Sequence, residues 1–406
     1  MRGEPGWQRD GNHARPVRPQ SANRPPAIIP RMVQRRVALV GPSRASLAVT
    51  LGPLIHEIGW RGHHTCCFAP ELGDAAASDA LARLGAEVEP LAAFRQGFSP
   101  LADQLALARL VRTFRKMRPD IVAGYSPKGA MLAGLAGRMA GVPHIVAMIG
   151  ELGRGFEESP DRVSKAQRQL QKALLRLGFS LSHTGVFFNE ENHKLLELHR
   201  LLPERLRRFP VNGSGIHLAR FPIAPLPPLD RGVMFLYAGP LDRRLGITEF
   251  CEAARYLKAK PGHYQCLVAG PEIRGPSSFP LSALKRYRNV VRYLGPNTDP
   301  RPFLAKTHVF VLPAKGDAIP QALLEAIAMG RPVITSTSRG CRVAVREGEN
   351  GMIVPPGDAS ALAGAMARLL LRPDLIPAMA RASRELAETQ FDSRRINALL
   401  LGAIDL

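Results

Sequence analysis

The 406-residue sequence contains no long hydrophobic run, and its apolar stretches stay well short of the about 18–20 residues that cross a bilayer as a helix. Its five cysteines are scattered, and no CxxC spacing typical of a metal site occurs. Reduced thiols in a cytoplasmic setting are therefore expected. GxSxG, HExxH and Walker-type phosphate-binding motifs are also missing, which argues against the common serine hydrolases, zinc proteases and P-loop enzymes.

Acidic residues are scarce: 34 Asp and Glu stand against 55 Lys and Arg, a formal net charge of +21. The excess is spread along the chain and does not form a single basic arm. It fits either a solvated basic surface or an attraction to an anionic membrane or substrate. Nucleic-acid binding is not expected, because no basic motif interleaved with aromatic residues accompanies the charge.

Residues 1–34 are rich in Pro, Arg and Gly and show no periodicity, which predicts a disordered basic tail. This tail lacks the apolar core of a signal peptide. Met32 directly precedes the first strand-like segment, so translation could start there instead of at Met1.

From Arg36 onward, short apolar runs alternate with helical patterns. The runs are VALVG, HTCCFAP, Ala86–Leu91, DIVAGY, HIVAMIG and TGVFFN in the first half, and MFLYAG, QCLVAG, VVRYLG, HVFVLP, PVITS and GMIVP in the second. Continuous apolar strands separated by helices predict parallel sheets that are covered on both faces. The predicted fold class is therefore α/β, with two doubly wound Rossmann-like domains facing across a cleft.

A change in composition marks the expected boundary between the two domains. Residues 212–232 are rich in Pro and Gly, as is typical of a linker. The predicted organisation is an N-terminal domain over 35–211, the linker 212–232, a C-terminal domain over 233–390, and a last helix in 391–406 that packs back on the N-terminal domain. In open sheets of this kind, ligands bind beyond the carboxyl ends of the strands.

Two carboxylates, Asp317 and Glu325, stand eight residues apart around the start of a predicted helix whose first residue is expected to be Pro320. The N–H groups at a helix start attract anions, whereas carboxylates accept hydrogen bonds from hydroxyl groups. An acid, an anion-binding helix start and a second acid together suit a nucleotide-sugar, with its sugar hydroxyls, diphosphate and ribose. A solvated Asp and a helix-surface Glu without a ligand remain the simpler alternative.

The chain resembles the family-4-type retaining glycosyltransferases of the GT-B fold, in which a Glu-x7-Glu pair takes this place and here begins with Asp317. The similarity covers roughly residues 36–390 and points to the bacterial branch that extends lipid-linked surface glycans. The segments that carry it are SPKGAMLAGLAGRMAGVPHIVAMIGELGRGF, RFPVNGSGIHLARF, LGITEFCEAARYLKAK and GCRVAVREGENGMIVPPGDASALAGAM.

The resemblance implies that Asp317, beside Gly316, contacts the hydroxyls of the donor sugar, and that Glu325 contacts the nucleotide ribose; both belong to the expected catalytic set. Uridine is favoured as the base. The diphosphate is expected to lie against the backbone of Ala318, Ile319 and Pro320. The other expected donor-binding residues are Gly41, Ser43, Gly239, Arg243 and Arg244.

One departure from the family concerns the segment GPLDRRLG. The family usually has an Arg at the position of Pro240 and a Lys at that of Leu245, two cations that stabilise the leaving diphosphate. Arg243 and Arg244 are near enough in sequence to replace one or both. An exposed basic turn is the alternative.

The acceptor is expected to bind the N-terminal domain. Ser126 and Lys128 follow the strand DIVAGY, and Glu151 follows HIVAMIG, so all three are predicted at carboxyl ends of strands. Ser126 and Glu151 are predicted to bind the acceptor, and Lys128 joins the catalytic set because it could meet an acceptor phosphate or the donor diphosphate. A solvated lysine and a loop acid without a role are the alternatives. His144, at a strand start, is expected to be structural.

The resemblance also implies transfer with retention, without a bound metal and without a cofactor beyond the nucleotide-sugar co-substrate. The expected acceptor is a glycan or a polyprenyl-diphosphate-linked sugar in bacterial surface polysaccharide synthesis, which would place the protein in the cytoplasm, peripherally on the inner face of the membrane. Two basic amphipathic segments, LADQLALARLVRTFRKMR and SKAQRQLQKALLRLGF, could bind an anionic surface. Alternatively, they pack on the sheet and present a solvated outer face.

Two other functions stay open. Loss of both diphosphate cations could leave a catalytically impaired nucleotide-sugar-binding partner of a glycan-assembly complex. A GT-B-fold epimerase would act on the nucleotide-sugar alone, without an acceptor.

Overall fold

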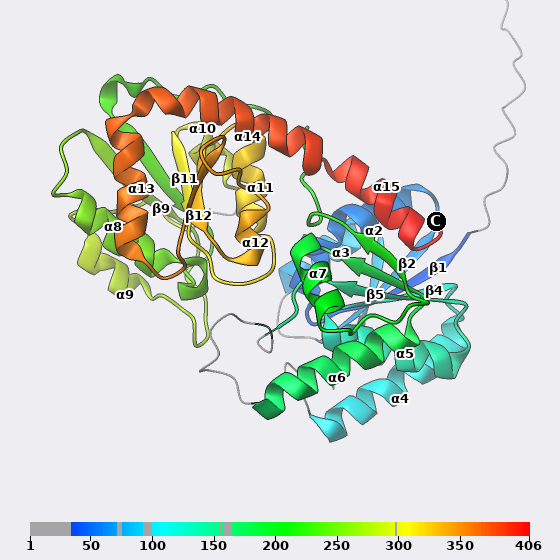
Figure 1. Ribbon diagram of the computed structural model, residues 1–406. Helices are drawn as coiled ribbons and strands as arrows, with labels where there is room; N and C mark the ends of the chain where they lie inside the picture. Colours follow the sequence, from blue (N-terminus) through cyan, green and yellow to red (C-terminus); the bar gives the residue numbers. More distant parts are fainter. Residues whose placement is uncertain (1–33, 71–74, 92–98, 154–155, 157–164, 297–298) are drawn as a thin grey trace, which may run out of the picture. The chain divides into compact units, whose positions relative to one another are not determined.

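The computed structural model describes residues 34–70, 75–91, 99–153, 156, 165–296 and 299–406. Arg35–Leu406 form one unit of the chain (Figure 1). The predicted tail, apart from Gln34, lies outside the described residues.

The first half of this unit is a parallel sheet of seven strands in the order β3-β2-β1-β4-β5-β6-β7. β1 lies between β2 and β4, with Val37 opposite Thr65 on one side and Ile121 on the other. The strands are β1 (Arg36–Val40), β2 (His64–Ala69), β3 (Ala86–Pro90), β4 (Ile121–Tyr125), β5 (His144–Ile149), β6 (Thr184–Phe187) and β7 (Arg207–Pro210). The helices are α1 (Arg44–Thr50), α2 (Gly52–Trp60), α3 (Ala75–Arg83), α4 (Pro100–Met117), α5 (Pro127–Ala140), α6 (Lys165–Leu181) and α7 (Glu190–Leu198).

The second half is a parallel sheet of six strands in the order β10-β9-β8-β11-β12-β13. The strands are β8 (Val233–Ala238), β9 (Tyr264–Ala269), β10 (Arg292–Tyr293), β11 (Val309–Leu312), β12 (Val333–Ser336) and β13 (Gly351–Val354). The helices are α8 (Ile247–Leu257), α9 (Leu281–Leu284), α10 (Arg301–Ala305), α11 (Gln321–Ala328), α12 (Arg339–Arg342), α13 (Ala359–Leu371), α14 (Ile376–Gln390) and α15 (Ser393–Ala403). Short 3-10 turns are Leu229–Arg231, Arg243–Leu245, Lys285–Tyr287 and Pro373–Leu375.

Two parallel sheets with alternating helices confirm the predicted fold class. The strands run almost without interruption through buried residues, as expected when helices cover both faces of a sheet. β7 was not predicted, because its sequence RRFP is mostly exposed and offers no apolar run. It lies at the edge of the first sheet, where a strand can be polar and can end in Pro210.

Two buried basic side chains hold the proline-rich segment, which connects the two sheets in sequence, against the second sheet. Arg331 is fully buried, and its Nη2 donates to the carbonyl oxygens of Ala224 and Pro225 at 2.6 and 3.0 Å. His308 accepts from the Met234 N–H through Nδ1, so its Nε2 donates to the Pro227 oxygen at 3.0 Å. Burial lowers the pKa of Arg331 to about 10, which keeps it charged at neutral pH.

The last helix, α15, packs with the first sheet although the chain reaches it only after the second. Ile396, Leu400 and Ile404 are buried in the same apolar cluster as Leu54 and Val146. Polar contacts secure it, including Asn397 Nδ2 to the Pro53 oxygen at 3.2 Å.

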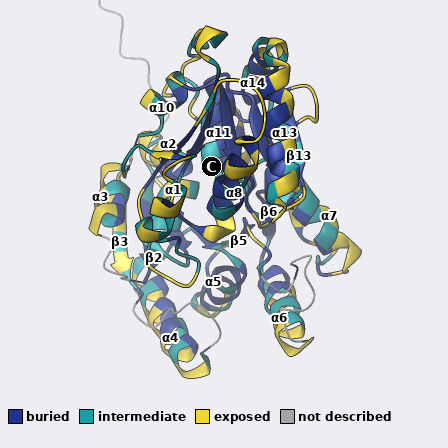
Figure 2. Ribbon diagram, turned by 90° about the vertical axis from the view of Figure 1, so that its left-hand side faces the viewer, coloured by how far each residue is buried: buried dark blue, intermediate teal, exposed yellow. Residues whose placement is uncertain are grey.

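Helices α4 and α6 lie on either side of α5, and many of their residues are exposed (Figure 2). Leu101 and Leu105 of α4 are 73% and 61% exposed, and Leu170 and Leu177 of α6 are exposed as well. Within the residues that the structure describes, no helix has the length and apolarity needed to traverse a membrane.

Candidate functional site

The loop between β11 and α11 carries Asp317. Gly316, directly before it, has φ +132°, a backbone conformation that residues with a side chain rarely adopt. The preceding Lys315 donates its N–H to the carbonyl oxygen of Arg244 at 2.7 Å. The loop after β8 and the loop after β11 are therefore joined at the carboxyl end of the second sheet.

The start of α11 is one residue later than predicted: Pro320 has extended backbone angles and precedes the helix, which begins at Gln321. Ala318 and Ile319, predicted to face the diphosphate, lie between Asp317 and this helix start. Helix α12 approaches closely, since a Cβ on Gly340 would lie 1.8 Å from the oxygen of Ala318. The segment that precedes α11 is thus packed closely against α12.

Asp317 is 8% exposed and is surrounded by groups from the first half of the chain. Its Oδ2 accepts a hydrogen bond from the Leu152 N–H at 2.5 Å. Its carbonyl oxygen accepts from Asn189 Nδ2 at 3.1 Å and from Asn192 Nδ2 at 3.3 Å. The structure therefore brings the predicted sugar-binding acid against the loops that follow β5 and β6.

Glu151 lies near Asp317, as the electrostatics of Glu151 show. Loss of solvent around the carboxyl group raises the pKa of Glu151, the charge of Asp317 raises it further, and Arg244 lowers it. Tyr125, at the end of β4, has its pKa raised to about 12 by burial, and the charges of Glu151 and Asp317 also raise it. The charges of Asp317 and Arg244, from the second half of the chain, therefore act on groups of the first half. We call Tyr125, Glu151, Arg244 and Asp317 together the Asp317 neighbourhood.

Glu325 lies in a different environment, on α11 among basic residues. Burial raises the pKa of its carboxyl group to about 7; Arg220 lowers that pKa, Asp299 raises it and Arg301 lowers it. Arg301 is itself held by Asp299 through Nε and Nη2, at 2.8 and 2.7 Å. The second acid of the predicted pair is therefore buried and under the electrostatic influence of two arginines and one aspartate.

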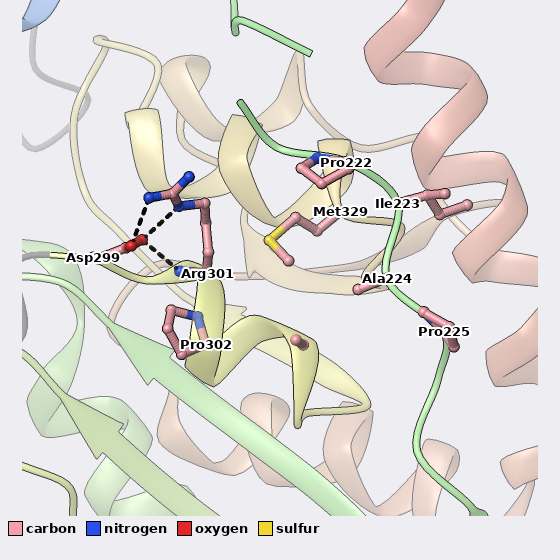
Figure 3. Close-up of a pocket in the computed structure, with 9 residues that line it drawn as sticks. Pro222, Ile223, Ala224, Pro225, Asp299, Arg301, Pro302 and Met329 are labelled. Atoms are coloured by element: carbon pink, nitrogen blue, oxygen red, sulfur yellow. Dashed lines mark hydrogen bonds and ion pairs between the residues drawn. The ribbon is translucent and has the colours of Figure 1, made fainter. Parts of the chain in front are cut away.

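A pocket lies next to this group, between the proline-rich segment and α10 (Figure 3). Arg301 and Asp299 form its polar side, and Met329, at the end of α11, lies opposite. The remaining lining residues are Pro222, Ile223, Ala224, Pro225, Pro302 and Ala305.

The two arginines of GPLDRRLG point to different places. Arg244 pairs with Asp242 at 2.8 Å and influences the pKa of Glu151, so its guanidinium belongs to the Asp317 neighbourhood. Arg243 instead donates to the Ser278 oxygen and lies over the ring of Phe279, 5.2 Å from its centre. Of the two candidates to replace the missing cations, the geometry favours Arg244.

The predicted residues of the N-terminal half occupy the carboxyl ends of their strands. Gly41 directly follows β1. Ser43 is the N-cap of α1, where its Oγ accepts a hydrogen bond from the Ser46 N–H at 3.0 Å. Ser126 caps α5 with φ +88°, a strained conformation for a residue with a side chain. Lys128 pairs with the buried Asp103 at 2.5 Å, so it is directed toward α4.

Several side chains at this site were missed from the sequence: Tyr125, Asn189, Asn192, Arg220, Arg301 and Arg339. Asn189 follows the predicted strand TGVFFN directly, so its position at a carboxyl strand end was a usable signal. No group of three or more His, Cys, Asp or Glu side chains among the described residues is placed to hold a metal ion. Metal independence stays a prediction.

Two family models match the chain. The model for group 1 glycosyl transferases matches residues 232–372, and the model for a glycosyl transferase 4-like domain matches residues 47–191. Together they cover most of both sheets.

Curated relatives and solved structures agree with these models. The N,N'-diacetylbacillosaminyl-diphospho-undecaprenol alpha-1,3-N-acetylgalactosaminyltransferase of Campylobacter jejuni is 24% identical, over 64% of this chain and 70% of that protein. The UDP-Gal:alpha-D-GlcNAc-diphosphoundecaprenol alpha-1,3-galactosyltransferase of Escherichia coli is also 24% identical, over 68% and 72%. Anabaena HepE in complex with UDP superimposes with a TM-score of 0.71 at 15% identity, covering 91% of this chain and 99% of HepE. The chain therefore belongs to the group 1, family-4-like glycosyltransferases, retaining enzymes with a GT-B fold.

Proposed function

We propose that the protein transfers a sugar from a UDP-sugar to a polyprenyl-diphosphate-linked sugar or another glycan acceptor of a bacterial surface polysaccharide. The observation that carries this proposal is the arrangement around α11. Asp317 precedes the helix and faces the first half of the chain, whereas Glu325 lies among Arg220 and Arg301. The similar proteins support these donor and acceptor classes. The names of the Campylobacter jejuni and Escherichia coli transferases give undecaprenyl-diphosphate-linked sugars as acceptors, and the structure of HepE is a complex with UDP.

The proposed reaction breaks the bond between the sugar C1 and the UDP oxygen and forms a bond from C1 to the acceptor oxygen on the same face. The acceptor proton passes to the leaving diphosphate, so no enzyme carboxylate serves as nucleophile. Asp317 orients the sugar hydroxyls, Glu325 holds the ribose, and the N–H groups of Ala318 and Ile319 face the diphosphate. Arg244 stabilises the charge that develops on the leaving group. Ser126 and Glu151 contribute to the acceptor side.

The test is a transfer assay in EDTA with a panel of UDP-sugars and a polyprenyl-diphosphate-linked sugar as acceptor. Arg244→Ala is expected to lower kcat about 10- to 100-fold, because one stabilising donor is removed from the developing charge. Arg243→Ala, the neighbouring arginine that contacts Phe279, is the matched control and should stay within about threefold of the unmodified protein. Equal effects of both variants would refute the role of Arg244.

The same assay separates the two alternative functions. Binding of UDP-sugars without transfer would identify a non-catalytic partner of a glycan-assembly complex. Isomerisation of the UDP-sugar without any acceptor would identify an epimerase.

The acceptor class requires contact with a membrane, and we infer that the outer faces of α4 and α6 provide it from the cytoplasmic side. Exposed leucines stand beside basic side chains on both helices. Basic residues near an anionic bilayer contribute about 1 kcal/mol each, and the leucines add apolar burial. The exposed basic residues are Arg109, Arg112, Arg115 and Lys116 on α4 and Lys165 and Arg176 on α6.

Reversal of two of these charges tests the membrane surface. The double variant Arg112→Glu/Lys116→Glu is expected to weaken binding to vesicles containing phosphatidylglycerol at least about tenfold in co-sedimentation. The control Lys258→Glu/Lys260→Glu changes the net charge equally, on exposed residues after α8. If both variants lose binding to the same extent, attraction is due to net charge and not to this surface.

A further inference from the structure

The buried polar groups around Asp317 form a hydrogen-bonded set that links the two halves of the chain. We call Leu152, Asn189, Asn192, Asp317 and Arg339 the Asp317 network. Asn189 and Asn192 follow β6, and both are fully buried. Asp317 follows β11, and Arg339 opens α12. All five groups therefore come from loops or helix starts at the carboxyl ends of strands.

Each asparagine in the network uses both hydrogens of its side-chain amide nitrogen. Asn189 Nδ2 donates to the oxygens of Asp317 and Arg339, both at 3.1 Å. Asn192 Nδ2 donates to the oxygens of Gly150 and Asp317, and its Oδ1 accepts from Arg339 Nε at 3.1 Å. An amide nitrogen has two hydrogens, and a carbonyl oxygen has two lone pairs. Both hydrogens of each asparagine, and both lone pairs of the Asp317 oxygen, are thus engaged.

Contact between the two halves of the chain also positions the carboxylate of Asp317. The Leu152 N–H donates to Oδ2, and Arg339 Nη2 lies 4.0 Å from that oxygen while donating to the Phe156 oxygen at 2.8 Å. The Leu152 N–H therefore fixes the position of one carboxylate oxygen. This contact also determines where the other carboxylate oxygen points. A change in the contact between the two halves would disturb several of these bonds together.

We propose that Asn192 and Arg339 are positioning residues that make the sugar-binding geometry of Asp317 depend on contact between the two halves. This inference rests on the proposed function, because it assigns Asp317 to the donor sugar. The nucleotide end of the donor lies at Glu325, outside the network. Asn189 Nδ2 still donates to the Asp317 carbonyl oxygen when Asn192 is lost, so the following Ala318 N–H, proposed to face the diphosphate, keeps its position. Loss of Asn192 is therefore expected to affect recognition of the sugar and leave recognition of UDP intact.

The neighbouring residue supplies a matched control. Glu191, next to Asn192 on α7, pairs with Arg342 of α12 at 2.6 Å, so it crosses the same interface. This pair is partly exposed and does not touch Asp317. Glu191→Ala therefore weakens the interface without altering the Asp317 network.

The experiment compares binding of UDP with binding of UDP-glucose, UDP-galactose and their N-acetyl-hexosamine counterparts, by calorimetry on the full chain. For Asn192→Ala, Kd for UDP is expected to stay within about twofold, while affinity for the preferred UDP-sugar and kcat for transfer fall at least about tenfold. For Glu191→Ala, the Kd for UDP, the affinity for the preferred UDP-sugar and kcat are each expected to stay within about twofold of the values of the unmodified protein. A general loss of structure would weaken UDP binding as well, so the split between UDP and UDP-sugar is the diagnostic readout.

Arg339→Lys provides a second test if Asn192→Ala does not fold. Lysine keeps the charge but cannot donate to Asn192 and Phe156 in the geometry of the guanidinium, so the same split is expected. Equal values for the network variants and Glu191→Ala would overturn the inference while the proposed function stands. Absence of UDP and UDP-sugar binding by the unmodified protein would overturn both.

Discussion

Replacing Asp317 by asparagine is expected to lower kcat/KM for sugar transfer about 100-fold. A hydrogen bond that involves a charged group contributes about 1.5–3 kcal/mol, and each 1.4 kcal/mol corresponds to about tenfold in rate. The carboxylate accepts from the Leu152 N–H and is proposed to accept from the donor sugar. An amide of similar shape loses the charge and places an N–H where one of these acceptors is needed.

The control for Asp317→Asn is Asp230→Asn, the same chemical change at an exposed position of the Leu229–Arg231 turn. It should leave both kcat/KM and the melting temperature unchanged. UDP affinity should also stay unchanged in Asp317→Asn, because the nucleotide is assigned to Glu325. Transfer within about threefold of the unmodified protein, measured with the same UDP-sugar, would show that Asp317 does not act on the donor.

The second large effect concerns the pH dependence of donor binding. The pKa of Glu325 is raised to about 7, chiefly by burial, so the carboxyl group is mostly protonated at pH 6 and mostly ionised at pH 8. Ionised carboxylates are acceptors only and are the better partner for ribose hydroxyls. Affinity for a UDP-sugar is therefore expected to increase about tenfold between pH 6 and pH 8, in step with the ionised fraction.

A UDP-sugar is the right probe for this titration, because its two phosphates are both esterified and do not titrate near pH 7, unlike the terminal phosphate of UDP. Glu325→Gln cannot ionise, so its affinity should be low at pH 8 and nearly independent of pH. Calorimetry at pH 6, 7 and 8 gives both curves. A pH dependence in Glu325→Gln as steep as in the unmodified protein would assign the titration to another group.

Predictions from the sequence were best where one local pattern determined the structure. Apolar runs such as DIVAGY and HIVAMIG identified β4 and β5. The strand β7 has the exposed sequence RRFP and gave no such pattern. Pro320 was misplaced by one residue because a proline suits both the cap and the first turn of a helix.

The candidate site was only partly predictable, because its geometry depends on contacts between distant segments. Asp317 and Glu325 stood out through their spacing around a helix start. Their environments could not be predicted from the sequence, because the hydrogen bond from Leu152 to Asp317 joins residues that are 165 positions apart. Arg243 and Arg244 are equivalent as neighbours in sequence, and their different contacts in the structure, with Phe279 and Asp242 respectively, separate them.

The position of α15 has a consequence for how the chain folds during synthesis. This helix and the residue after it supply Ile396, Leu400 and Ile404 to the apolar cluster of the first sheet, yet they are synthesised only after the whole second sheet. Until then, the nascent first sheet exposes the surface around Leu54 that α15 later covers. Co-translational folding of this half therefore stays incomplete until α15 has emerged, and the second half emerges and folds while the first still awaits this helix.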